Sequence, residues 1–171
     1  MAFDIFADLK ISDGEGAKAI ESTIKELIDT QVLVGIPESE AAREEGKLTN
    51  VELMYIHSNG SPLAGIPARP VIEPALENAK NKIGTLMSDA AQAALSGNQE
   101  EMNANLEKAG LAGQSASQDW FTNPSNAWSP NTEATKKAKG WKGSTDPKPL
   151  IDTGELRRSI TYVVRSKSES S

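Results

Sequence analysis

Hydrophobic residues recur at helical spacing in two long stretches of the chain. Within 13–30 and again within 74–97, apolar side chains fall at intervals of three and four residues, which places each set on one face of a helix. Ser12 and Asp13 are candidate caps of the first stretch. The spacing therefore predicts helices over both ranges, the second being the longest in the chain.

Two shorter segments have the pattern of strands. Residues 31–37 form a β-branched run that stops at Gly35 and Pro37, which predicts a buried strand that is apolar on both faces. Residues 160–165 alternate, with Ile160, Tyr162 and Val164 on one face and Thr161, Val163 and Arg165 on the other. This second segment is typical of a strand with one buried face.

Residues 99–120 have a helical pattern that glycine interrupts. Met102, Leu106 and Ala109 share one side of a helix over 99–109. Glycines at 110 and 113 are expected to break it, with a possible resumption over 115–120.

The remaining segments have the composition of connections. Residues 38–50 are rich in glutamate and predict an exposed loop or a short helical excursion, and four prolines and glycines within 62–70 predict a stiff, extended arm. Residues 121–149 hold four prolines and five lysines, which predicts a long loop pinned by Trp128 and Trp141. The tail, 166–171, is expected to be disordered. Together these features predict a single α+β domain over 1–171, with a small, mostly antiparallel sheet packed against two or three helices and a long Pro/Lys-rich loop.

Composition narrows the class of protein. The chain has no cysteine, which excludes disulfide frameworks and thiolate chemistry, and its aromatic content of 5% predicts a mostly aliphatic core. The start of the chain lacks the pattern of a signal peptide, and no run of about eighteen apolar residues appears, so a soluble protein made in the cytoplasm is expected.

Charge is divided unevenly along the chain. Residues 1–125 hold 9 basic and 19 acidic side chains, a balance of −10, whereas residues 126–171 hold 9 and 5, a balance of +4. Opposite potentials favour head-to-tail contact between identical subunits, although a solvated surface without a partner explains the same counts.

No set of residues predicts catalysis, a cofactor or a metal. His57 is the only histidine and lacks a second ligand at metal-binding spacing, so a structural role is expected for it. Ser22 and Lys25 have Ser-x-x-Lys spacing without its companion motifs, and the glycines before Lys18 do not complete a P-loop. The carboxylate pair Asp152 and Glu155 fits helix capping better than acid–base work.

Two ordered blocks of sequence do carry a recognisable pattern. The first includes His57 and Gly60, followed by an Ile-Pro-Ala-Arg-Pro run with Pro67, Arg69 and Pro70. The second is a Trp-x-Pro-x-Thr segment with Trp128 and Pro130, a lysine-rich gap, and then Pro-Leu-Ile-Asp-Thr-Gly-x-Leu-Arg-x-Ser-Ile, which contains Asp152, Gly154 and Leu156. Asp152, Thr153 and Gly154 also predict a turn and a brief helix through Arg157.

These blocks resemble the virion-morphogenesis and tail-completion proteins of long-tailed bacteriophages. Ser58, Asn59 and Val71 stand where that family has an acidic residue, an aromatic residue and Phe. The resemblance implies that residues 51–57 are helical and that His57, Gly60, Pro67, Trp128, Pro130, Asp152, Gly154 and Leu156 are structural. Candidate subunit or partner contacts are Arg69, Pro70, Lys136, Lys137, Trp141, Arg157 and Arg158, the last two forming bridges either within the fold or across a subunit boundary.

The resemblance implies a structural protein and not an enzyme. The resemblance implies that the protein forms a ring, expected to be a hexamer, at the neck or tail terminus of the virion. The virion is expected to be assembled in the host cytoplasm. The neighbours of the ring would be the head connector or adaptor protein and the tail-tube or tail-terminator protein, with genomic DNA passing through the lumen and no membrane. The alternative is a DNA-binding module acting through the basic segment 136–148, whose lysines neutralise phosphates.

Overall fold

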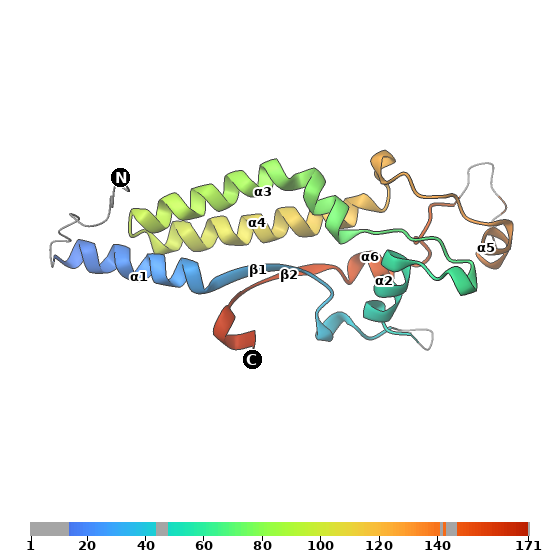
Figure 1. Cartoon of the computed structure of the whole chain (residues 1–171), viewed down its shortest axis with the longest axis horizontal. Coiled ribbons are helices and arrows are strands. Elements are labelled where there is room, and N and C mark those ends of the chain that lie inside the picture. Colours follow the sequence, from blue (N-terminus) through green and yellow to red (C-terminus); the bar gives the residue numbers. More distant parts are fainter. Residues whose placement is uncertain (1–13, 44–47, 141, 143–146, 171) are drawn as a thin grey trace, which may run out of the picture.

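The computed structural model describes residues 14–43, 48–140, 142 and 147–170. Its central feature is an antiparallel hairpin of two long helices, α3 (Ile72–Leu95) and α4 (Gln99–Trp120) (Figure 1). Gly97 turns the chain between them with a φ of 69°, and the Asn98 side chain caps α4 by accepting the Glu101 amide. The expectation of a longest helix near 74–97 is confirmed.

A two-stranded antiparallel sheet lies along one side of this hairpin and packs against α4. Helix α1 (Glu15–Asp29) leads directly into β1 (Thr30–Gly35), which pairs with β2 (Thr161–Ser166) in a register from Thr30↔Ser166 to Gly35↔Thr161. The predicted helix over 13–30 and both predicted strands are therefore confirmed, and the fold is α+β. Ser12 and Asp13, the expected caps, lie outside the described residues.

Glycines 110 and 113 do not interrupt α4, so the predicted break is wrong. Both face the sheet: a β-carbon on Gly110 would lie 2.2 Å from the Tyr162 ring, and one on Gly113 would lie 2.8 Å from Val34. The glycines let the helix and the sheet approach closely, and this packing offsets the low helix propensity of glycine.

The outer face of the sheet is uncovered in the described part of the chain. Leu33 is 40% exposed and Val163 is 38% exposed, whereas Val32 and Val164 pack into the core beside them. The strand predicted over 31–37 is present, but the prediction that it is buried is wrong for the outer face, because only the other face is covered by α4.

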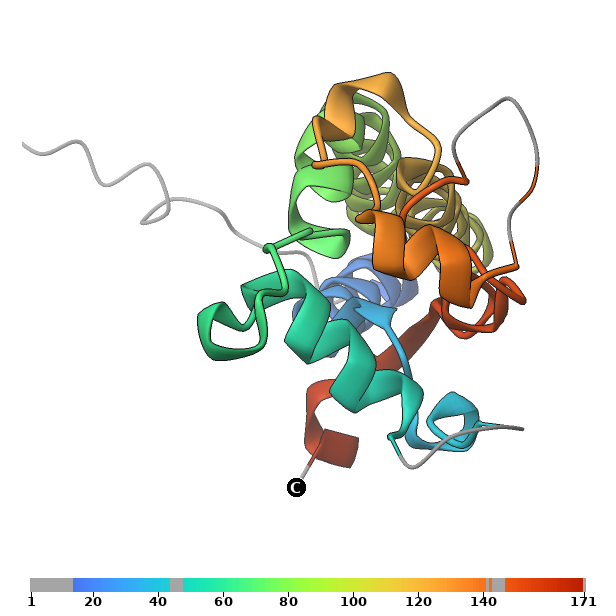
Figure 2. The same cartoon turned by 90° about the vertical axis from the view of Figure 1, so that its right-hand side faces the viewer.

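The far end of the molecule is built from short helices (Figure 2). Helix α2 (Asn50–Asn59) begins with a capping box in which Thr49 and Glu52 exchange hydrogen bonds. Helices α5 (Glu133–Ala138) and α6 (Glu155–Arg158) face it. The helical reading of residues 51–57, which the resemblance implied, is confirmed, as is the brief helix through Arg157.

Two buried clusters hold these parts together. One lies under the long helices and combines Ala90, Ala93 and Ala94 with Met102 and Leu106. The other joins the short helices to the hairpin, and its members are Met54, Val71, Ala75, Trp120, Phe121, Leu156 and Ile160. Small alanines in the first cluster allow the close helix approach that the low aromatic content requires.

Two of three predicted connections differ from the structure, and the third takes one of its two expected forms. Residues 121–149 are not a long loop in their described part, because they contain a 3-10 turn at Pro124–Asn126 and helix α5, which Thr132 caps. Residues 38–50 include a short 3-10 turn at Glu38–Glu40, one of the two forms expected there. The tail was expected to be disordered from 166, yet Ser166 ends β2 and Lys167–Ser170 form a 3-10 turn whose Lys167 ammonium donates to the Ile28 carbonyl.

Candidate binding cleft

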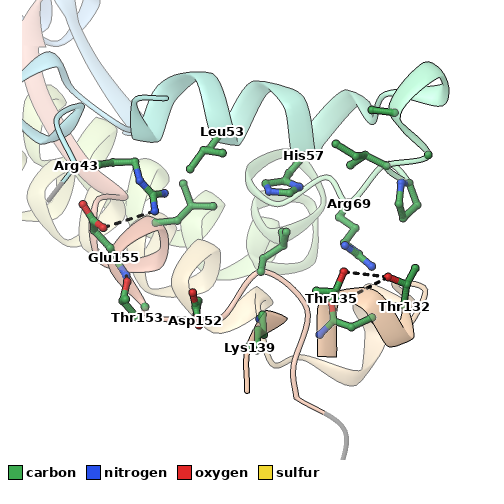
Figure 3. Close-up of a pocket in the computed structure, with 18 residues that line it drawn as sticks. Arg43, Leu53, His57, Arg69, Thr132, Thr135, Lys139, Asp152, Thr153 and Glu155 are labelled. Atoms are coloured by element: carbon green, nitrogen blue, oxygen red, sulfur yellow. Dashed lines mark hydrogen bonds and ion pairs between the residues drawn. The ribbon is translucent and has the colours of Figure 1, made fainter. Parts of the chain in front are cut away.

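The two sequence blocks meet at one open cleft of about 410 Å³ at the short-helix end of the molecule (Figure 3). His57, Pro67 and Arg69 line it from the first block, and Asp152, Gly154 and Leu156 line it from the second. Thr132, Thr135 and Lys139 close it from α5 and the two residues that flank this helix. We call this space the motif cleft.

The first wall depends on a sharp reversal at the end of α2. Gly60 has a φ of 73°, and a β-carbon there would lie 2.7 Å from the Ala68 backbone nitrogen, so no other residue fits without a backbone shift. Ser61 and Ile66 form a bridge beyond it, and the Arg69 amide donates to the His57 carbonyl at 2.6 Å. The proline-rich arm is thereby folded back along α2, which brings Arg69 beside His57.

The opposite wall is the turn that precedes α6. Gly154 has a φ of 78°, and Leu150, which also lines the cleft, has a φ of 57° that costs a non-glycine residue about 1–2 kcal/mol. The Thr153 hydroxyl accepts the Glu155 amide at 3.3 Å, so threonine, rather than the aspartate also considered from the sequence, provides the side-chain contact at the start of α6. The Arg158 guanidinium donates to the Thr153 carbonyl at 2.9 Å and holds the turn against the helix.

Arg69 is the most deeply placed charge of the motif cleft, with only 7% of the residue exposed. Its Nη2 donates to the carbonyls of Ser129 and Pro130 at 2.9 and 3.4 Å. Its Nε is buried without a hydrogen-bond partner among the described residues, and none of the described carboxylates forms an ion pair with it. Burial lowers the pKa of Arg69, which still stays charged at any pH where the protein is folded.

Two further basic groups share this region. The Lys139 ammonium donates to the carbonyls of Ile151 and, at 3.4 Å, Lys148. Burial lowers the pKa of Lys139 while the Asp152 carboxylate opposes that change, and burial together with the Arg69 charge lowers the pKa of His57. His57 is therefore neutral at pH 7, and its Nδ1 is buried without a partner among the described groups.

The two acidic groups of the cleft differ in their surroundings. Glu155 pairs with Arg43 at 3.8 Å, and both side chains are about four-fifths buried, with 20% and 22% exposed. Asp152 is exposed at the rim. The cleft therefore combines positively and negatively charged side chains with apolar lining residues. This arrangement does not place a nucleophile beside a general base.

The remaining predicted contact residues lie outside the cleft. Pro70 is exposed on the side of the arm that faces the start of α3. Arg157 donates to Asp119 at 3.3 Å and Arg158 to its own turn, so both make the contacts within the fold that the sequence left open. Trp141 lies outside the described residues.

The basic segment does not present all its lysines outward. Lys137 is exposed, but the Lys136 side chain is mostly buried, with 14% exposed, and pairs with Glu133 at 2.8 Å, and Lys139 lines the cleft. A DNA-binding patch would thus depend on Lys137, Lys142 and Lys148, which are exposed. This weakens the alternative of a DNA-binding module.

The motif residues predicted to be structural support the segments around the cleft. Trp128 packs edge-on against Phe121, with ring centroids 6.0 Å apart and planes at 86°, and so anchors the segment that carries Pro130. Gly60 and Pro130 border an adjoining hollow.

Several important residues were not predicted. Arg43 lies in a charge-rich segment without a pattern, and Thr135 and Lys139 were read as part of a loop. The Thr-Glu pair at 132–133 is a helix-start signal that could have revealed α5, and with it the inward direction of Lys139.

Comparisons with known proteins identify no relative: no family model, curated protein or solved structure matches the chain. In the described part of the chain, no helix is long and apolar enough to cross a membrane. Across the same residues, no group of three metal-ligating side chains comes together.

Proposed function

We propose that this chain is a structural virion protein of the head–tail junction, which forms a ring at the neck or tail terminus through contacts between copies. The observation that carries the proposal is the meeting of the two sequence blocks. Residues that resemble the phage family lie far apart in the sequence, yet His57, Arg69, Asp152, Gly154 and Leu156 form one cleft. A chance resemblance in scattered residues would not be expected to converge in this way.

The surface supports association with other chains. Val51, Tyr55 and Leu63 are exposed on α2 and the following turn, with Tyr55 71% exposed, and Leu33 and Val163 are exposed on the sheet. A closed ring needs two different surfaces on each copy, because head-to-tail contacts join unlike patches. Two apolar surfaces on separate elements meet that requirement.

The charge distribution supports a role around DNA. The acidic body, with a balance of −10 over residues 1–125, would repel phosphates and let a genome slide through a lumen. We place Glu38, Glu40, Glu44 and Glu45 toward the lumen: Glu38 and Glu40 are exposed on their 3-10 turn, and Glu44 and Glu45 lie outside the described residues. A ring image with Glu38 and Glu40 on the outer wall would contradict this part of the proposal.

Light scattering and electron microscopy of the purified protein test the proposal. We expect a single large mass and ring-shaped particles, formed either by the protein alone or after mixing with the connector or tail-tube protein of the same virus. A protein that stays monomeric under both conditions, or that holds a small metabolite in the cleft, would contradict it.

A further inference from the structure

We propose that the motif cleft is a receptor site for an acidic peptide segment, and that Arg69 is the group that binds its carboxylate. The site goes beyond the proposed function, which does not assign a ligand to the cleft. The source of the segment, a neighbouring copy of this acidic chain, rests on that function, whereas the site itself does not.

The first argument is the unbalanced charge of Arg69. Only 7% of the Arg69 residue is exposed, and a buried guanidinium normally has a carboxylate partner, because removing a charge from water is costly unless it is paired. Among the described residues, the guanidinium donates to two neutral carbonyls, and Nε has no partner. An incoming carboxylate would supply the missing negative charge and an acceptor.

The second argument is the set of groups around Arg69. The hydroxyls of Thr132 and Thr135 lie 3.0 Å apart on the facing wall, and Figure 3 shows Arg69 reaching toward them. Hydroxyls can donate to a carboxylate that Arg69 holds, and the Lys139 ammonium lies on the same side. Glu155 is already paired with Arg43 at the other end, so it does not satisfy this charge.

The third argument favours a peptide over a nucleic acid as the ligand of the cleft. Arg69 lines the cleft and is 7% exposed, a setting that suits the end of a single glutamate side chain better than a rigid duplex backbone. Leu53, Ile66 and Leu156 supply apolar walls for side-chain methylenes. Exposed Asp152 at the rim can accept hydrogen bonds from peptide amides, which a duplex backbone does not offer.

The test uses the full chain and a peptide with blocked ends, Ile-Pro-Glu-Ser-Glu-Ala-Ala, which has the sequence of residues 36–42 and serves only as a chemical probe of the cleft. His57 lines the cleft and is the only histidine, so its imidazole resonances report binding without ambiguity. We expect the peptide to shift these resonances and to raise the imidazole titration midpoint, and a peptide with Gln in place of both Glu residues to leave them unchanged. Arg69→Gln should weaken binding about tenfold or more, because a charged hydrogen bond is lost. Arg157→Gln, the matched control outside the cleft, should bind as the wild type does.

Several results would overturn the proposal. These are no response to the glutamate peptide, an equal response to its glutamine counterpart, or unchanged binding by a folded Arg69→Gln variant. Tighter binding of inorganic phosphate or duplex DNA would instead identify a phosphate site. If Arg69→Gln does not fold, the two wild-type peptide titrations decide the question. Light scattering measures ring assembly separately, so the failure of either proposal is distinguishable from the failure of the other.

Discussion

At the scale of single residues, the same glycine-to-alanine substitution is expected to change stability in opposite directions at two helical positions. Gly110→Ala should destabilise the protein by about 1–3 kcal/mol, since its β-carbon would lie 2.2 Å from the Tyr162 ring and the sheet must shift. Gly84→Ala, in the exposed middle of α3, meets nothing within 4 Å and should stabilise by about 0.5–1 kcal/mol. Urea unfolding of both variants checks the pair, and equal effects would show that the helix and sheet are not in close contact.

His57 gives a residue-level prediction for pH. Burial first, and then the charge of Arg69, lower the pKa of His57 from its usual value of about 6.5. The unfolded chain then binds more protons between the lowered pKa and about 6.5, so stability should fall as the pH drops through that window. His57→Gln should remove this contribution to the pH dependence of unfolding.

The same residue can be titrated directly. Lys139, Asp152 and the Arg43–Glu155 pair also line the cleft, but Arg69 is the charge that acts most on the imidazole. Arg69→Gln should therefore raise the NMR titration midpoint of His57. A midpoint that is normal in the wild type would contradict the burial of this side chain.

At the scale of elements, β2 offers neighbouring valines on opposite faces. Val164 packs into the core under α4, and Val164→Thr should cost about 1–3 kcal/mol because a hydroxyl enters an apolar site. Val163 is 38% exposed on the uncovered face, and Val163→Thr should change stability by less than about 0.5 kcal/mol. Threonine keeps the β-branched shape in both cases, so strand propensity does not differ. Thermal or urea unfolding that ranks the two variants the other way would refute the assigned faces.

Secondary-structure elements were predicted correctly where apolar periodicity extends over many residues. Prediction failed where tertiary contacts determine whether an element continues. The helices over 72–95 and 15–29 are driven by their own apolar spacing, which is visible in the sequence. The continuity of α4 through Gly110 and Gly113 is set by β2 and β1, which a local pattern cannot show. Helix α5 is too short for periodicity, so only its Thr132 cap marked it.

The candidate site shows the same division. The motif residues could be identified from the sequence, because glycines and prolines are typical of turns and indicate those at Gly60 and Gly154. That Arg69 and Lys139 would converge, with Arg43 across the cleft from them, depends on how α2 and α5 pack, and this was not predictable. A sequence does not distinguish a surface lysine from a buried one, so the inward direction of Lys139 was not predicted.

At the scale of the whole molecule, the uneven charge predicts how copies would associate. In the proposed ring, the acidic body and the basic C-terminal section, with balances of −10 and +4, would attract each other between copies, and salt would screen that attraction. The mass measured by light scattering should therefore fall as sodium chloride is raised. A mass that rises with salt would instead indicate that apolar surfaces such as Tyr55 and Leu63 dominate the contact.

A pair of double variants locates the charges responsible. Replacing exposed Lys137 and Lys148 with Gln removes two positive charges from the basic section, and should weaken association and flatten its salt dependence. Replacing exposed Lys80 and Lys82 makes the same change in net charge on α3, within the acidic body, and should leave association intact or strengthen it. Both variants alter the total charge equally, so a difference between them reports position. Equal weakening would mean that net charge, and not the meeting of two opposite surfaces, controls the assembly.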